Sequence, residues 1–121
     1  MSEKIALGLG DNTDYEIVWN SAVFEDLIRR HAIRASELAI DKPITSERDL
    51  VISILGFLQA GTGGERHVAA SAIVEEFARN FAIKITLGGT SVRAAIAMRK
   101  LGYTSALHLV TINEHVRRLI P

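Results

Sequence analysis

Residues 82–111 constrain the fold of this chain more than any other segment. The run AIKITL at 82–87 is typical of a strand, and the two glycines after it allow a tight turn into an Ala-rich segment with helical spacing. Gly102 is a typical helix end, and the run ALHLVT at 106–111 is typical of a second strand. Such a strand, helix, strand unit predicts parallel strands joined by a right-handed crossover. We therefore expect an α/β fold with a partial parallel sheet and flanking helices.

The remaining chain predicts one more strand of this sheet and several helices. The apolar run KIALGL at 4–9 is typical of a buried strand, and residues 10–12 after it are predicted to form a polar turn. We expect strand 4–9 to pair in parallel with 82–87 or 106–111, since the last unit must lay its strands into one sheet. The other expected elements are a short strand at 17–19 and five helices. These helices are expected to be opened by Asn20 or Ser21, by Thr45 or Ser46, by Ser71, by Thr90 or Ser91 and by Asn113.

The composition excludes several classes of protein. The 121 residues, 48% of them hydrophobic, suit one globular domain. Without Cys, neither a disulfide nor a Cys-based zinc site can form. Fourteen basic residues balance fourteen acidic ones and only 6% of residues are aromatic, so no nucleic-acid partner is expected. No uncharged run reaches the length of a bilayer span and the N-terminus has no signal-peptide pattern, so we expect a cytoplasmic protein without a membrane partner.

Two glycine-containing turns, at 8–14 and 88–91, invite comparison with phosphate-binding loops. Neither fits a standard dinucleotide or P-loop signature, and paired glycines often only allow a tight strand-to-helix turn. The amides of such a helix start can still bind a hydroxyl or an anion. Asp11 and Asp14 follow a predicted strand, where α/β sheets place their ligands, but Asp is also an ordinary turn residue. These residues alone predict a polar site at strand ends and leave its ligand open.

The histidines do not predict a metal site. His31 and His108 lie on apolar elements, where they are expected to be packed. His115 belongs to the run EHVRR rather than to the two-histidine zinc motif HExxH. Glu65 and Arg66, after a glycine-rich loop, can be interpreted as a solvated ion pair of little energetic weight. No metal ligand is therefore expected.

Four motifs, taken in order, resemble a known family. They are GLGDNTD at 8–14, GTGGER at 61–66, LGGT at 87–90 and an Ala-rich helix ending in KLG at 100–102. Together they resemble the N-terminal part of the ADP-dependent sugar kinases, the glucokinases and phosphofructokinases of the ribokinase-like superfamily. The Gly-Gly turn and its helix are shared with ATP-dependent ribokinase-like enzymes, whereas the Gly-x-x-x-Glu-Arg element is similar to the ADP-dependent branch.

This resemblance implies a ribokinase-like α/β fold made of a core sheet and elements of a smaller lid domain. Residues at about 1–12 and 91–121 would belong to the core, and those at about 13–90 largely to the lid. The implied activity of the intact enzyme is transfer of a phosphoryl group from ADP to a hydroxyl of a hexose or hexose phosphate, with magnesium neutralising the phosphates.

The resemblance also implies a set of sugar contacts. Asn12 and Asp14 would contact sugar hydroxyls, and Glu65 would reach in from the lid. Gly89 and Thr90 would close the pocket floor. Ionised carboxylates only accept hydrogen bonds, and polyols offer many hydroxyl donors. A lid-borne acceptor would couple sugar binding to closure, which excludes water from phosphoryl transfer.

Three residues depart from the family pattern. Thr13 stands where the family usually has an apolar residue, and Thr90 where it commonly has Gln or Asn. Arg93 stands where a small or amide residue is typical. It would either contact the phosphate of a phosphorylated sugar or lie on the solvent face of its helix. The identity of the sugar is therefore left open.

The catalytic residue of the family is missing from this sequence. The base of the superfamily is an Asp in a Gly-Ala-Gly-Asp-like motif before a later helix, and the similar run GLGD at 8–11 lies on the first strand instead. We therefore expect a fragment that binds sugar but binds neither ADP nor magnesium on its own, transfers no phosphoryl group and associates through an uncovered sheet edge. The alternative is a non-catalytic small α/β module that binds a polyol or a partner protein.

Overall fold

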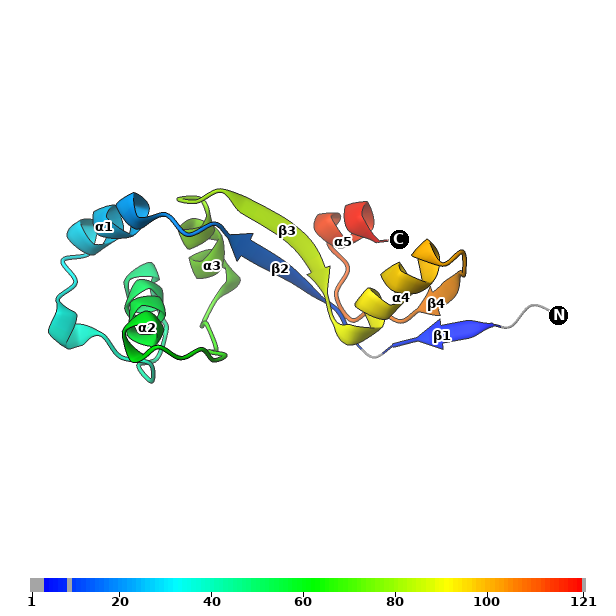
Figure 1. Ribbon diagram of the computed structural model, residues 1–121, viewed down its shortest axis with the longest axis horizontal. Helices are drawn as coiled ribbons and strands as arrows, with labels where there is room; N and C mark the ends of the chain where they lie inside the picture. The colour runs from blue at the N-terminus through cyan, green and yellow to red at the C-terminus, as the bar shows by residue number, and fades with distance from the viewer. Residues whose placement is uncertain (1–3, 9, 121) are drawn as a thin grey trace. The chain divides into compact units, whose positions relative to one another are not determined.

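The computed structural model describes residues 4–8 and 10–120 and divides the chain into two compact units. Unit 1 comprises Met1–Glu16 and Lys84–Pro121, and unit 2 comprises Ile17–Ile83. Within the described residues the protein is a mixed α/β structure with two small sheets and five α-helices (Figure 1). The core and lid boundaries expected from the sequence are near residues 12 and 91, whereas the units divide after residues 16 and 83.

Unit 1 contains a two-stranded parallel sheet. β1 (Ile5–Leu7) pairs with β4 (Ser105–Leu107), and Ile5 lies opposite Ser105. The expected parallel pairing of the first strand with residues 106–111 is therefore confirmed, although both strands are shorter than expected. Leu9, the last residue of the expected first strand, lies outside the described residues.

A second pair of strands is antiparallel. β2 (Asn12–Ile17) pairs with β3 (Ile83–Gly88), and their arrows run in opposite directions in Figure 1. The expected polar turn at 10–12 extends one residue too far and the expected strand at 17–19 is misplaced, because β2 begins at Asn12 and ends at Ile17. The side chains of β2 alternate between two faces of the strand. Its backbone N–H and C=O groups form hydrogen bonds with β3, whereas in a turn many of them would be hydrogen-bonded to water.

The strands on either side of α4 (Thr90–Lys100) belong to different sheets. β3 pairs with β2 and β4 pairs with β1, so the expectation that residues 82–111 lay both strands into one sheet is wrong. The physical reason is that β2 offers β3 a partner of its own length, six residues each. α4 packs against β1 and β4.

The α5 helix (Glu114–Leu119) of unit 1 begins at its expected cap residue, whereas α4 begins after Gly89 and has no cap from Thr90 or Ser91. Gly89 precedes α4 with a φ of +101°, a conformation that favours glycine. Asn113 caps α5, because its Oδ1 accepts a hydrogen bond from Val116 N at 2.9 Å. The apolar core of this unit consists of Leu87, Val92 and Val116, with Ile96, Leu107, Leu109 and Leu119 packed around them.

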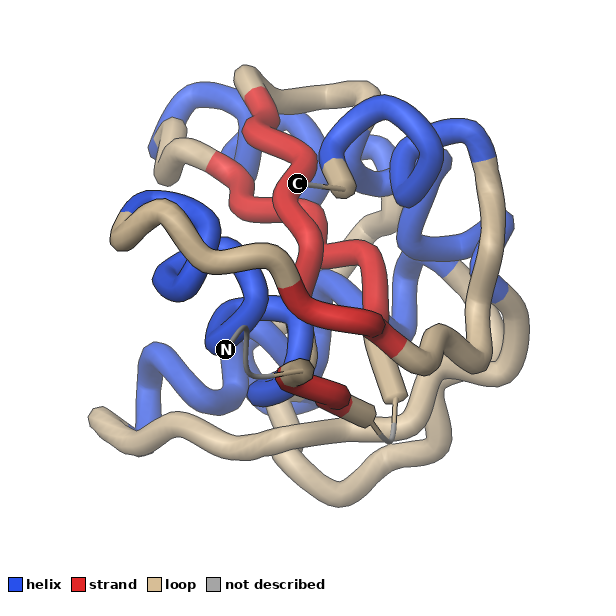
Figure 2. The backbone as a smooth tube through the Cα atoms, turned by 90° about the vertical axis from the view of Figure 1, so that its right-hand side faces the viewer, coloured by secondary structure: helices blue, strands red, loops and turns tan. Residues whose placement is uncertain are grey.

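Unit 2 is mainly helical, and helices, blue in Figure 2, make up most of the regular structure of the chain. Its elements are α1 (Ser21–Arg30), the 3-10 turn η1 (Ala35–Glu37), α2 (Glu47–Ala60) and α3 (Ser71–Ala78). Asn20 and Ser46 cap α1 and α2, and Gly61 ends α2 in the left-handed region, as expected from the sequence. None of the helices in the described residues has the length and apolar character needed to cross a bilayer.

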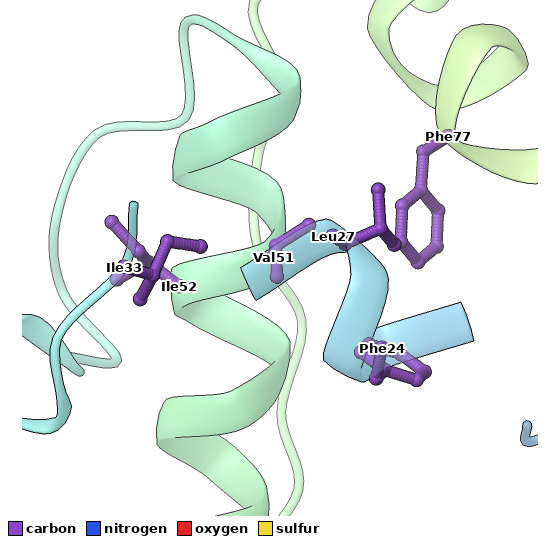
Figure 3. Close-up of a cluster of buried hydrophobic side chains, with 6 residues drawn as sticks. All are labelled: Phe24, Leu27, Ile33, Val51, Ile52 and Phe77. Carbon is purple, nitrogen blue, oxygen red and sulfur yellow. The ribbon is translucent and has the colours of Figure 1, made fainter. Parts of the chain in front are cut away.

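The core of unit 2 lies between these helices (Figure 3). Six buried side chains form it: Phe24, Leu27, Ile33, Val51, Ile52 and Phe77. Burying each of them stabilises the folded unit by about 1.5–3 kcal/mol relative to an exposed side chain. Gly56 lets α2 approach the neighbouring backbone closely, since a Cβ at this position would lie 2.7 Å from the Ala39 carbonyl oxygen.

Candidate functional site

The chain segments that follow β1 and β4 are joined to each other and to the start of α4. After β1, Asp11 Oδ1 accepts hydrogen bonds from Val110 N at 2.9 Å and Thr111 N at 2.8 Å, in the loop that follows β4. Ser91 Oγ, in the first turn of α4, donates to Gly10 O at 2.9 Å. Asp11 and Ser91 therefore hold together the strand ends, where open α/β sheets bind their ligands.

The turn at Gly88 and Gly89 lies very close to the chain after β1. A Cβ at Gly89 would lie 2.9 Å from Gly10 O. A Cβ at Gly88 would lie 2.5 Å from Asn12 Nδ2 and would also collide with Asp14 Oδ2. Neither position has room for a side chain. Because Gly88 has none, Asn12 and Asp14 can lie close to the start of α4.

Asn12 and Asp14 lie two residues apart on β2, on the same face of the strand, and contact each other. The Asn12 side-chain amide donates to Asp14 Oδ1. Arg93 Nη2, on α4, lies 3.8 Å from Asp14 Oδ2. The side chain of Asp14 is 34% exposed and that of Arg93 is 67% exposed, so both can still bond to a ligand. A carboxylate, an amide and a guanidinium are therefore presented together, which suits a ligand with several hydroxyl groups.

Gly89 and Thr90 form the N-terminal end of α4. Gly89 occupies the cap position and has no side chain that could accept from the first helical N–H groups. Thr90 is exposed beside it. The positive end of the α4 dipole is therefore not capped by a side chain at Gly89. It lies next to Gly88, the residue that approaches Asn12 and Asp14.

Thr13 lies on the opposite face of β2 from Asn12 and Asp14, since side chains alternate along a strand. Its Oγ1 accepts a hydrogen bond from Asn113 Nδ2 at 3.3 Å. Asn113 also caps α5, so Thr13 ties β2 to this helix. This contact gives a structural reason for a polar residue at a position where the resembled family usually has an apolar one.

The loop with Glu65 and Arg66 belongs to unit 2. The Arg66 guanidinium donates to Ile40 O and, at 2.6 Å, to Lys42 O. The interpretation of these two residues as a solvated ion pair is therefore wrong for Arg66, which ties the loop to backbone carbonyls. Glu65 is exposed on the same loop. The predicted site residues that the structure brings together in unit 1 are Asn12, Asp14, Gly89, Thr90 and Arg93, here called the strand-end site.

The histidines differ from expectation at one position. His31 is partly buried and its Nε2 lies 2.8 Å from Glu47 Oε1, in agreement with a packed histidine. His108 is exposed, so its expected packing is wrong. The reason is that β4 ends at Leu107, one residue before His108. In the described part of the chain, no three His, Cys, Asp or Glu side chains gather closely enough to hold a metal ion.

A hollow of about 520 Å³ adjoins the strand-end site and was not expected from the sequence. Residues of β2, β3 and α4 line it, and Arg93 borders both the hollow and Asp14. The other polar side chains in its lining are those of Glu16, Lys84, Thr86 and Lys100. Their spacing is the signal that could have identified them. Glu16 follows Asp14 by two residues on a strand, and Lys100 follows Arg93 by seven on a helix, so each pair shares a face.

Comparison with known proteins does not assign a family. No family model matches the sequence, and no curated protein or solved structure is significantly similar to it. The function is therefore argued from the geometry of the strand-end site and from the order of the motifs.

Proposed function

We propose that this chain is the sugar-binding N-terminal portion of a ribokinase-like, ADP-dependent sugar kinase that phosphorylates a hexose or hexose phosphate. The observation that carries the proposal is the close approach of the turn at Gly88 and Gly89 to the side chains of Asn12 and Asp14. The two segments lie far apart in the sequence, and the pairing of β2 with β3 brings them together beside the start of α4. Their proximity therefore supports a shared ligand site.

The chemistry of the strand-end site suits a sugar. Asp14 can accept hydrogen bonds from sugar hydroxyls, and the Asn12 amide that donates to Asp14 Oδ1 orients the carboxylate. The first N–H groups of α4 have no intrahelical acceptor and can donate to sugar oxygens. Glu65, on unit 2, is included in the proposal as a further acceptor because the family resemblance assigns it that role.

Phosphoryl transfer itself needs groups other than these sugar-binding residues. Magnesium and ADP, when bound to the intact enzyme, would supply the phosphoryl group and neutralise its charge. The residues of this chain bind and orient the acceptor hydroxyl. The resemblance implies a lid, and its closure would exclude the water that hydrolyses the nucleotide.

Calorimetric titration of the 121-residue chain with hexoses and hexose phosphates tests the proposal. Asp14→Asn removes the charge and keeps the size of the side chain. It should weaken sugar binding by about ten- to a hundredfold, since a hydrogen bond to a charged group contributes about 1.5–3 kcal/mol.

Glu114→Gln is the matched control, because it removes an 87% exposed carboxylate of the same unit. It should leave sugar binding unchanged. Undiminished sugar binding in Asp14→Asn would overturn the assignment of β2 to the sugar. So would a loss confined to ADP binding, since Asp14 would then belong to the nucleotide.

A further inference from the structure

The hollow beside the strand-end site carries an excess of positive charge. Lys84, Arg93 and Lys100 line it, and Glu16 is the single carboxylate among the residues that do so. Three cations and one anion leave a formal charge of +2. Within the described residues of unit 1, neither Lys84 nor Lys100 forms an ion pair. Like charges held together without counter-ions repel each other, so this arrangement favours a bound anion.

A second observation points to a ligand at the same place. Thr86 lines the hollow, and its Oγ1 is buried without a hydrogen-bond partner among the described residues. A buried hydroxyl without a partner costs free energy, so such groups are nearly always hydrogen-bonded in native proteins. An oxygen of an anion bound in the hollow would be an acceptor for this hydroxyl.

The donors are placed by two regular elements rather than by a loop. Lys84 and Thr86 share one face of β3, because they are two residues apart on a strand. Arg93 and Lys100 share one face of α4 and lie two turns apart. A hollow of about 520 Å³ lies within the range of about 300–1,000 Å³ typical of small-ligand sites, so it has room for more than one phosphate group.

We propose that this hollow binds the phosphate group of a phosphorylated sugar whose hydroxyls contact Asn12 and Asp14. The inference rests on the proposed function and narrows it, since it names a hexose phosphate rather than a free hexose as the acceptor. Arg93 connects the two parts of the site, because its guanidinium lies 3.8 Å from Asp14 Oδ2 and also lines the hollow. Lys84 and Lys100 complete a set of charge-assisted donors for a phosphate dianion.

Calorimetry on the 121-residue chain tests this inference with five probes: a hexose, a hexose 6-phosphate, a pentitol, inorganic phosphate and ADP. We expect the hexose 6-phosphate to bind about tenfold or more tightly than the hexose, and its advantage to shrink as salt is added. The double variant Lys84→Gln/Lys100→Gln should remove most of this advantage and leave the affinity for the free hexose unchanged.

Two further variants keep the test decisive. Arg117→Gln/Arg118→Gln removes two cations of the same unit from α5, away from the residues that line the hollow, and should not change hexose phosphate binding. Thr86→Val keeps the shape of the side chain and removes a hydroxyl that has no partner in the described structure, so the fold should be retained. It should weaken hexose phosphate binding by about two- to tenfold. It therefore gives a readout even if the double lysine variant does not fold.

The outcomes separate this inference from the proposed function. Equal affinities for hexose and hexose phosphate, both reduced by Asp14→Asn, would overturn the phosphate site and leave the sugar site standing. ADP binding that depends on Lys84 and Lys100, without binding of hexose phosphate, would show that the phosphate belongs to a nucleotide and overturn the inference. If neither sugar nor sugar phosphate binds, the proposed function fails together with the inference.

Discussion

Asn12 and Asp14 occupy the space that a side chain at Gly88 would take, since a Cβ there would lie 2.5 Å from Asn12 Nδ2. Both colliding groups are ends of side chains that can rotate, so we expect Gly88→Ala to displace them rather than to unfold unit 1. Sugar affinity should fall about tenfold or more, while the free energy of unfolding should fall by about 1 kcal/mol, the low end for overpacking. Calorimetry and thermal denaturation measure the two effects.

Gly63→Ala provides the control for this substitution. A Cβ at Gly63 would meet nothing within 4 Å in the described structure, so neither quantity should change. If Gly88→Ala bound sugar as well as the unmodified chain, the strand-end site could not be the sugar site.

Asp49, in the first turn of α2, is a buried carboxylate with an unusual pKa. Burial raises the pKa of Asp49, but hydrogen bonds from Lys42 at 2.9 Å and from Thr45 outweigh this effect and lower it from 3.8 to about 2. A carboxyl group with a lower pKa in the folded state stabilises the fold above its unfolded pKa. That stabilisation is lost as the pH falls from about 4 to about 2.

We therefore expect Asp49→Asn to reduce the free energy of unfolding of unit 2 at neutral pH by about 1–2 kcal/mol and to flatten its pH dependence between about pH 4 and pH 2. Denaturant titrations followed by the fluorescence of Trp19, which stacks on the core residue Phe24, measure this. Asp26→Asn breaks an exposed pair with Arg30 and should cost about 0.5 kcal/mol or less. An acid transition as steep in Asp49→Asn as in the unmodified chain would contradict the assignment.

At the scale of elements, the side-chain caps of three helices and the pairing of β1 with β4 were predictable, whereas the pairing of β2 with β3 was not. Asn20, Ser46 and Asn113 each accept a hydrogen bond from an amide three residues ahead, so the signal is local and can be read from the sequence. Within β2 the sequence predicts a turn at Asn12 and a strand only from Ile17, because the residues between them are largely polar. Its partner β3 lies beyond the whole of unit 2 in the sequence, and nothing within either strand specifies so distant a partner.

Some residues of the candidate site could be predicted from the sequence, and others could not. Asn12, Asp14 and Gly89 belong to continuous motifs, so the sequence singled them out, and their roles in sugar binding stay predictions. Lys84 and Lys100 belong to no motif. Helical spacing places Lys100 on the same face as Arg93, but only the position of β3 beside β2 and the packing of α4 gather Lys84 with them, so the hollow itself emerges from the structure alone.

Asn113 connects two elements of unit 1, since its Oδ1 caps α5 and its Nδ2 donates to Thr13 Oγ1. We expect Asn113→Ala to lower the free energy of opening of α5 by about 1 kcal/mol, seen as faster amide hydrogen exchange in that helix. Asn113→Asp keeps the cap acceptor and loses only the donor to Thr13, so exchange should accelerate less. Identical exchange in Asn113→Ala and the unmodified chain would show that the cap does not stabilise α5.

At the scale of the whole molecule, unit 2 is one continuous segment with its own core, whereas unit 1 is built from two segments of the chain. The two ends of unit 2 are hydrogen-bonded neighbours, because Val18 N donates to Ala82 O at 3.0 Å. Neighbouring ends and a separate core are typical of an inserted domain. We therefore expect residues 17–83 to fold when produced alone.

Circular dichroism and Trp19 fluorescence of the isolated segment should show one cooperative thermal transition. Leu27→Ala should abolish or strongly lower this transition, since truncating a buried leucine costs about 2–5 kcal/mol. An isolated segment without a cooperative transition would mean that unit 2 depends on unit 1 for its stability.

The hydrogen bond between Val18 and Ala82 also sets an order of events during folding. In an unfolded chain, β2 and β3 can meet only by closing a loop as long as unit 2, at an entropic cost of about 4 kcal/mol. Once unit 2 has folded, its ends are already side by side and that cost has been met. The contact of Asn12 and Asp14 with Gly88 is therefore a late event, and a substitution in the core of unit 2 would delay the assembly of the proposed sugar site.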